Sequence, residues 1–216
     1  ISPRLTFYGD RDDRVQSFST NIVVDNTWDY QEFEEGIGPD DIKLHFNNNW
    51  RLRGGWALGA SFLLETFRYP PQLYSNYYVI RPATATTPAD TVPFIGRKRI
   101  PNYDLLFTAN TPQWPKFSAN AFAIIGRDEN FEEWAPGYIF FLTWGSTYRP
   151  NDQLRVQFNY NEQRTLRYSD KSIVRLSRIP RLKLEYQVTR PLFVRVIGQY
   201  VADQRDELRD DADTGF

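Results

Sequence analysis

The chain has 216 residues, with 26 Lys and Arg against 27 Asp and Glu and a formal net charge of -1. It therefore has no overall positive field to attract nucleic acid, and the absence of Cys excludes disulfides and thiolate metal sites. The mean hydropathy is -0.58, and no apolar run approaches the ~18 residues of a membrane helix. Aromatic residues make up 16% of the chain, and they favour strands and apolar–water interfaces.

Alternation of apolar and polar residues predicts strands along the whole chain. The clearest case is residues 42–52, in which Leu44 and Phe46 share one face and Lys43 and His45 share the other. In chain order the pattern predicts about ten strands, at residues 4–8, 18–28, 42–52, 56–65, 103–109, 117–125, 138–145, 154–162, 182–188 and 192–202. No segment has a convincing helical period, so the sequence predicts an all-β fold.

The connections between these strands alternate in length. Short ones lie near residues 10–13, 53–54, 111–115, 150–152 and 189–191, and long ones near 31–41, 69–101, 127–136, 168–179 and 203–216. Outer-membrane barrels have tight periplasmic turns, long external loops, strands of about 9–11 residues and aromatic girdles. The alternation favours an antiparallel up-and-down transmembrane β-barrel over a soluble β-sandwich, which would bury the apolar faces in a core.

The directions of the strands bear on the size of this barrel. The first strand leads into a short turn and so runs toward the periplasm, whereas the last runs outward into the acidic segment 203–216. A single-chain bacterial barrel usually begins and ends at the periplasmic side with an even number of strands. We therefore expect residues 1–216 to form a single domain that is a segment of a barrel with about twelve or more strands.

In such a barrel the polar face of each strand points into the lumen. The lumen-facing candidates are Lys43, His45, Asn47, Asn49, Arg51, Glu65, Asp104, Arg155, Gln157, Asn159, Lys183, Glu185 and Arg195. These residues either line a polar pore or pair across the lumen and brace a closed barrel. Their mixed signs favour pairing, because an ion-selective ring tends toward one sign.

The longest connection, residues 69–101, combines tyrosines, prolines and a basic triplet. Its ligand candidates are Tyr69, Tyr74, Tyr77, Tyr78, Arg97 and Arg99. Tyr rings stack on sugar faces and suit protein contacts, and surface cations pair with phosphates such as those of lipopolysaccharide. We interpret the segment as an external loop that forms a constriction or receptor surface; a mobile surface loop is the alternative.

Two other features are weaker candidates for chemistry. Asp206, Asp210, Asp211 and Asp213 form a carboxylate-rich run of the kind that binds Ca²⁺, although their spacing is not that of an EF-hand. His45 is the only histidine, which argues against a histidine metal site and leaves a hydrolase dependent on a nearby nucleophile. We interpret the run as a surface loop and His45 as a polar lumen residue, with no metal or other cofactor and no catalysis.

At residues 179–215 the sequence reads IPRLKLEYQVTRPLFVRVIGQYVADQRDELRDDADTG, with FNNNWR at 46–51 and WALG at 56–59. These segments resemble the C-terminal region of an uncharacterised bacterial family, domain of unknown function 5916. The resemblance implies an N-terminal carbohydrate-binding-like module followed by an outer-membrane barrel, and it offers no catalytic residues to carry over. A carbohydrate ligand is thus implied by the family and is not visible in these residues.

The sequence therefore predicts a non-enzymatic outer-membrane barrel protein of a Gram-negative-type envelope, acting as a surface receptor or passage for small polar or carbohydrate-like ligands. The expected partners are outer-membrane lipid, lipopolysaccharide and glycans, with no nucleic acid, and no oligomeric state is indicated. The alternative is a soluble all-β ligand-binding module, and the third interpretation is an outer-membrane hydrolase that uses His45.

Overall fold

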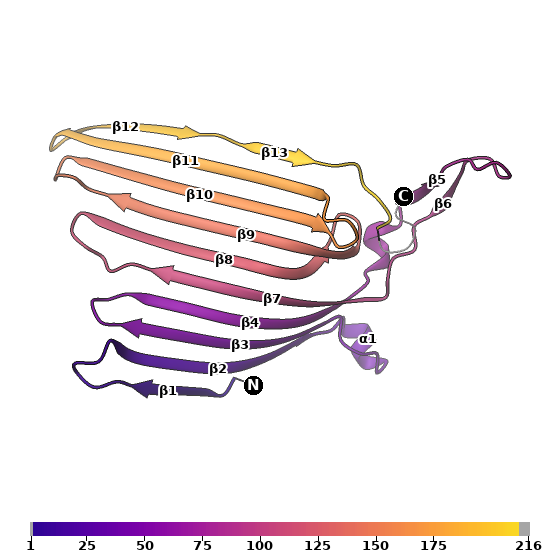
Figure 1. Cartoon of the computed structure of the whole chain (residues 1–216), viewed down its shortest axis with the longest axis horizontal. Helices are drawn as coiled ribbons and strands as arrows, with labels where there is room; N and C mark the ends of the chain where they lie inside the picture. Colours follow the sequence, from indigo (N-terminus) through magenta and orange to yellow (C-terminus); the bar gives the residue numbers. More distant parts are fainter. Residues whose placement is uncertain (1, 212–216) are drawn as a thin grey trace.

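The computed structural model describes residues 2–211, whose regular secondary structure is almost entirely β-strand (Figure 1). Eleven strands form one antiparallel sheet: β1 (Arg4–Tyr8), β2 (Val15–Thr27), β3 (Asp41–Leu52), β4 (Ala57–Arg68), β7 (Arg99–Asn110), β8 (Phe117–Asn130), β9 (Ala135–Tyr148), β10 (Leu154–Arg167), β11 (Ile173–Thr189), β12 (Leu192–Gln199) and β13 (Ala202–Arg205). Each strand pairs with the next in this order, except that β12 and β13 both pair with β11. The prediction of an all-β, up-and-down antiparallel fold is confirmed.

The connections are sorted by length between the two ends of the sheet. Short turns join β1 to β2, β3 to β4, β7 to β8, β9 to β10 and β11 to β12 at one end, which we call the turn end (Figure 1). At the opposite loop end, residues 28–40 contain α1 (Tyr30–Glu34). Residues 69–98 contain the 3-10 helix η1 (Pro71–Tyr74) and a hairpin of β5 (Tyr78–Arg81) and β6 (Asp90–Pro93).

Three connections that the sequence predicts as long loops are shorter in the structure. β8 continues to Asn130 before β9 begins at Ala135, and β10 continues to Arg167 before β11 begins at Ile173. The expected loops at 127–136 and 168–179 are therefore turns, because ladder pairing continues beyond the point at which the apolar alternation fades. The expected loop at 203–216 begins as part of β13, which pairs with β11.

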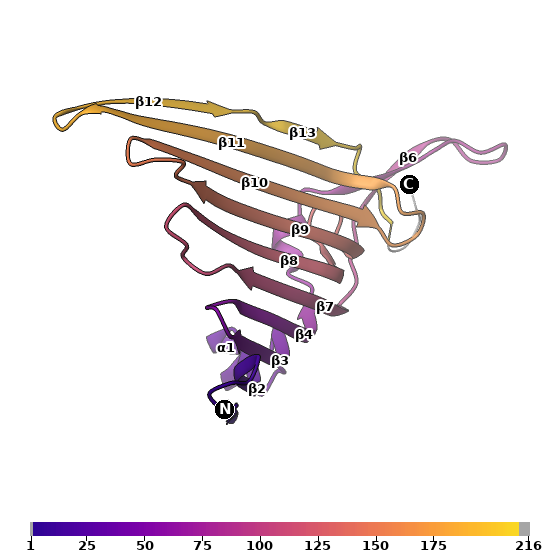
Figure 2. The same cartoon turned by 60° about the vertical axis from the view of Figure 1, so that its left-hand side comes forward.

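The sheet is open within the described residues. β1 pairs only with β2, and the C-terminal strands β12 and β13 pair only with β11. In Figure 2 the N-terminal strands are foreshortened while β11 and β12 are seen at nearly full length, so the strand direction turns across the sheet. Such a turn is the right-handed twist expected of a large antiparallel sheet.

No helix among the described residues is long and apolar enough to cross a membrane.

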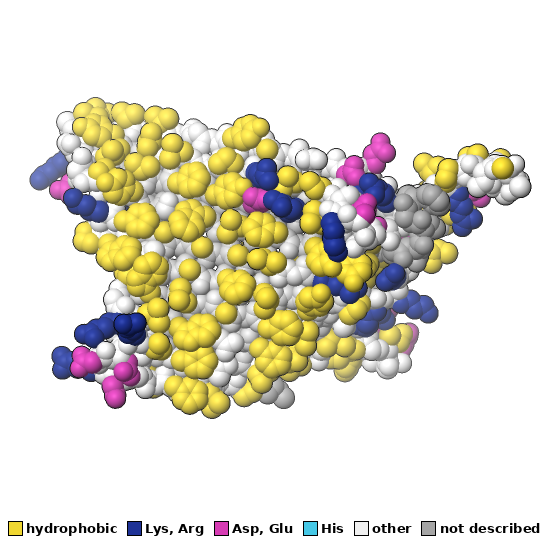
Figure 3. Space-filling model, in the orientation of Figure 1, with side chains coloured by type: hydrophobic (Ala, Val, Ile, Leu, Met, Phe, Trp, Pro, Cys, Tyr) yellow, Lys and Arg dark blue, Asp and Glu magenta, His cyan; other side chains and the backbone are white. Residues whose placement is uncertain are grey.

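The ladder register gives the sheet one apolar face and one polar face. Leu44 of β3 lies opposite Leu64 of β4, which lies opposite Tyr103 of β7, so alternate residues form rows across the sheet. Figure 3 shows the apolar face, over which no described helix or second sheet lies. Its exposed side chains include Leu5, Phe7, Ile22, Val24, Ile42, Phe62, Leu64, Tyr103, Leu105, Phe107, Ile125, Trp144, Phe158, Leu182, Leu184, Tyr186, Val194 and Val196.

A buried aromatic cluster fixes the long 69–98 segment at the loop end. The cluster consists of Tyr74, Ile100 and Trp134, with Phe67, Tyr69 and Phe94 packed against them. The Trp134 indole donates a hydrogen bond to the Arg97 carbonyl at 2.8 Å, and the Tyr74 hydroxyl donates to the Phe131 carbonyl at 2.5 Å. Burial raises the pKa of Tyr74 to about 12, so this hydroxyl stays a hydrogen-bond donor into alkaline solution.

Candidate functional site

The polar face of the sheet gathers the site residues predicted on the strands. The register places Lys43, His45, Asn47, Asn49, Arg51, Glu65, Asp104, Arg155, Gln157, Asn159, Lys183, Glu185 and Arg195 on this one face. For example, Lys43 lies opposite Glu65, and Gln157 lies opposite Lys183. Because the side chains of a strand alternate with a period of two, the sequence pattern alone is able to sort these residues onto one side.

Charged residues on the polar face pair with neighbours in the same or the adjacent strand. The Lys43 ammonium is 2.7 Å from the Glu65 carboxylate. The Glu185 carboxylate is 3.0 Å from Lys183 and 2.8 Å from Arg195. The paired side chains lie beside each other on the surface of the sheet, because neighbours on one face are within reach of each other. At these positions the face therefore carries paired charges and not a row of a single sign.

Toward the turn end, the polar face is rich in amides and hydroxyls. A hollow of about 830 Å³ is lined there by the amide patch, which we define as Thr6, Ser19, Asn21, Asn49, Thr108 and Asn110. Two glycines let polar side chains lie flat on the neighbouring strands. A Cβ at Gly59 would be 2.4 Å from the Thr108 hydroxyl, and a Cβ at Gly145 would be 2.6 Å from the Asn120 side-chain oxygen. The patch thus offers closely spaced hydrogen-bond donors and acceptors.

His45 lies on this face without a nucleophile opposite it. Its partner in β4 is Leu63, whereas Ser61 lies opposite Asn47. A carboxylate oxygen of Asp25 is 3.9 Å from His45 Nε2. Nucleophilic catalysis needs a hydroxyl or thiol within hydrogen-bond reach of the base, and none is hydrogen-bonded to this imidazole among residues 2–211. His45 is positioned here as a polar residue of the sheet wall.

The tyrosines of the 69–98 segment are only partly available to a ligand. The Tyr69 ring packs against the rings of Tyr74 and Trp134 in tilted arrangements, with its centroid 5.9 Å and 5.6 Å from theirs. Tyr77 is 38% exposed and Tyr78 is 60% exposed. Tyr74, which the sequence predicts as a surface ligand residue, is instead buried, because the segment folds against the turn between β8 and β9.

Of the two arginine candidates, Arg99, the first residue of β7, joins connections at the loop end through its side chain. The Arg99 guanidinium donates to the Thr66 hydroxyl at 2.7 Å and to the Pro39 carbonyl at 2.5 Å. Arg99 therefore ties residues 28–40 to β4, and several of its donors are already used by the protein. The Arg97 carbonyl accepts the hydrogen bond of Trp134 described above.

A buried ion-pair network at the loop end has no counterpart in the sequence prediction. Arg167 is fully buried, and its Nε donates to both oxygens of Glu133 at 3.0 Å and 3.1 Å. Its Nη1 reaches the Ser172 hydroxyl at 2.9 Å and Asp206 at 2.8 Å. Arg209 is 3.2 Å from the same Asp206. The network joins three separate chain segments, so no local spacing in the sequence reveals it.

The acidic run near the C-terminus belongs to the surroundings of this network. The Arg167 guanidinium holds the pKa of Asp206 below its ordinary value. Asp211 accepts a hydrogen bond from Ser169, Asp210 is buried, and Asp213 lies outside the described residues. Asp206 and Asp211 thus face arginines and a hydroxyl and do not converge as a shell of Ca²⁺ ligands.

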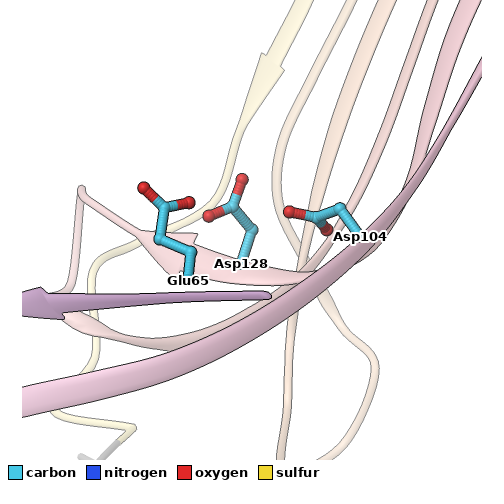
Figure 4. A group of neighbouring side chains, drawn as sticks. All are labelled: Glu65, Asp104 and Asp128. Carbon is cyan, nitrogen blue, oxygen red and sulfur yellow. The ribbon is translucent and has the colours of Figure 1, made fainter. Parts of the chain in front are cut away.

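Three other carboxylates do converge, on the polar face near the loop end. Figure 4 shows Glu65 of β4, Asp104 of β7 and Asp128 of β8, with one oxygen from each lying within 4.8 Å of the others. Glu65 and Asp104 are predicted on this face from the alternation. Asp128 is missed, because the sequence places it in an expected loop, whereas β8 extends through it.

No protein-family model, curated protein or solved structure matches this chain, so its function is inferred from the two faces and the loop end of the sheet.

Proposed function

We propose that this sheet forms part of the wall of an outer-membrane β-barrel in a Gram-negative-type envelope. Further strand pairing at its two open edges closes the barrel. The protein is a non-enzymatic surface receptor or passage for small polar, carbohydrate-like ligands. The observation that carries the proposal is an exposed apolar face directly opposite a polar face on one long-stranded sheet. In a membrane barrel the first face meets lipid and the second meets a wet interior.

The extent of the apolar face favours lipid over water. The largest apolar patch on a typical soluble monomer is about 300–600 Å². Here exposed apolar side chains occupy each strand of the large sheet from β1 to β12. A soluble domain would need a second layer over this face, since apolar sheet faces in water are buried against other elements. Lipid covers the face directly, provided that the edges are paired so that no backbone group is left unsatisfied.

The apolar row on β9 also ends as such rows do in membrane barrels. It runs from Tyr138 to Tyr148, a length comparable to the ~9–11 residues of a membrane-crossing strand. On β10 the ion pair of Glu162 and Arg164, 2.7 Å apart, interrupts the apolar face opposite Leu142 and Phe140. The aromatic residues at the two limits of the β9 row match the lipid headgroup level. Outer-membrane lipid and lipopolysaccharide are the partners proposed for this face.

The polar face suits neutral polar ligands better than ions. The amide patch offers hydroxyl and amide groups that complement the hydroxyls of a sugar. Lys43 and Glu65 are already paired, whereas an ion-selective passage uses charges of one sign. Tyr77 and Tyr78 at the loop end add exposed rings of the kind that stack on sugar faces.

Planar-bilayer conductance and oligosaccharide binding, measured on purified full-length protein in detergent, test this function. Asn49→Ala, in the amide patch, is expected to weaken glycan binding or alter the conductance. Asn48→Ala, one residue away on the opposite face, is expected to leave both unchanged. A protein that neither conducts nor binds glycans contradicts the receptor or passage function. A protein that remains monodisperse without detergent supports the soluble ligand-binding module instead.

A further inference from the structure

Three carboxylates from three adjacent strands converge on the polar face near the loop end. One oxygen from each of Glu65, Asp104 and Asp128 lies within 4.8 Å of the other two (Figure 4). Two ligands on opposite sides of a Ca²⁺ ion are about 4.8 Å apart, because the Ca²⁺–oxygen distance is about 2.4 Å. The three oxygens are therefore close enough to bind one cation together.

Two side chains at this place, Asp104 and Asn102, are buried and have polar atoms without a hydrogen-bond partner. Asp104 is 2% exposed and Asn102 is 3% exposed. Asp104 Oδ1 and both polar side-chain atoms of Asn102 have no partner among the described residues. Asn102 lies opposite Glu65 in the ladder, so the two Cβ atoms are about 5 Å apart on the same face. Buried polar groups in folded proteins are nearly always satisfied, so these unpartnered atoms point to a ligand at this place.

The charges at this place are out of balance. Lys43 supplies one positive charge, with its ammonium 2.9 Å from Asp41 and 2.7 Å from Glu65. No ion pair joins Asp104 or Asp128 to a Lys or Arg within the part of the chain that the structure describes. Carboxylates held this close repel one another unless they share a proton or a cation. An added cation removes the repulsion and also satisfies the unpartnered oxygens.

We propose that Glu65, Asp104 and Asp128, together with the side-chain oxygen of Asn102, bind a divalent cation, and that this cation is Ca²⁺. Carboxylate and amide oxygens without His or Cys form a donor set for hard cations, and Ca²⁺ accepts the irregular shells that Mg²⁺ disfavours. Gly126 makes room for this arrangement, since a Cβ there would be 2.2 Å from Asp104 Oδ1.

The site lies at the base of the 69–98 segment. The carboxylates come from β4, β7 and β8, and the 69–98 segment leaves from the end of β4 and returns at the start of β7. A cation bound there joins these strands at the base of the segment that carries the exposed tyrosines. The site does not depend on the receptor or passage function proposed above.

Calorimetric titration of CaCl₂ into full-length protein, after treatment with EDTA in detergent, tests the site. We expect one Ca²⁺ per chain, with affinity at least about tenfold weaker in Asp104→Asn and in Asp128→Asn. Asp25→Asn is the matched control, because Asp25 lies opposite Lys43 on the same face but outside the group. Ca²⁺ should raise the melting temperature of the wild type and of this control, and of neither Asp104→Asn nor Asp128→Asn.

Two results would overturn the proposal. Wild-type protein that binds no Ca²⁺ shows that the carboxylates share protons instead. Wild-type affinity in both Asp104→Asn and Asp128→Asn, with loss in Asp206→Asn, places the ion in the acidic C-terminal segment. Far-ultraviolet circular dichroism of each variant checks its fold. If Asp104→Asn or Asp128→Asn does not fold, Asp206→Asn locates the ion, because it keeps wild-type affinity only if the ion does not bind in the acidic C-terminal segment. A protein that binds Ca²⁺ at this site but neither conducts nor binds glycans keeps the cation site and rejects the proposed function.

Discussion

Replacing Phe158 by arginine tests which solvent meets the apolar face. Phe158 lies on the apolar face of β10 and is 37% exposed, and its neighbour Asn159 lies on the polar face. Removing the buried two-thirds of a phenylalanine costs about 1–2 kcal/mol in any solvent, since full burial contributes about 1.5–3 kcal/mol. An arginine near the midplane of a lipid-facing strand costs a further ~2–4 kcal/mol. Phe158→Arg should therefore cost about 3–6 kcal/mol in a membrane but only about 1–2 kcal/mol in water.

The assay is equilibrium unfolding in guanidinium chloride of full-length protein folded into lipid vesicles, with tryptophan fluorescence as the signal. Asn159→Arg is the matched control, and its free energy of unfolding should stay within about 1 kcal/mol of the wild type, because lumen-side substitutions are tolerated. The lipid assignment is refuted if Phe158→Arg costs only about 1–2 kcal/mol, or if Asn159→Arg is the more destabilising of the two.

Three further predictions concern the loop end. Arg167→Met leaves Glu133 buried without its partner and should lower the free energy of unfolding by about 3–5 kcal/mol. Adding Glu133→Gln should restore part of this loss, and a loss below about 1 kcal/mol contradicts the network. Trp134→Ala should cost about 3–5 kcal/mol and speed proteolysis of residues 69–98, and unchanged proteolysis would show that the aromatic cluster does not fix that segment. The pKa of Asp170 is lowered to about 2, chiefly by hydrogen bonding from Ser172. Because the pKa of Asp170 is lower in the folded than in the unfolded chain, its ionised carboxylate stabilises the fold at pH values above the unfolded pKa. This stabilisation is lost on acidification, so the melting temperature should fall between about pH 4 and pH 2, and less steeply in Asp170→Asn.

The sequence predicts the strands and their faces well, because a period of two is a local property. Residues 42–52 alternate clearly and form β3 with nearly the same bounds. The same local rule places His45 and Lys183 on one face although they are far apart in the chain, since each strand is sorted independently before pairing brings them onto one sheet.

The loop end is not predictable in the same way, because it depends on contacts between distant segments. Arg167 and Glu133 meet only after β8, β9 and β10 have paired. Asp128 is assigned to a loop in the sequence prediction because Arg127 and Glu129 beside it give no apolar alternation, yet ladder hydrogen bonds extend β8 through it. The burial of Tyr74 likewise results from the path of a connection, for which the sequence contains no period.

The most direct test of the membrane assignment is the solvent accessibility of successive residues along β10. Residues 1–216 contain no Cys, so single cysteines from Val156 to Asn161 can each carry a spin label in vesicle-folded protein. If the sheet is a barrel wall, labels at 156, 158 and 160 should collide mainly with lipid-soluble oxygen, and labels at 157, 159 and 161 with a water-soluble nickel chelate. Equal access of the nickel chelate to both rows would contradict the assignment of the apolar face to lipid.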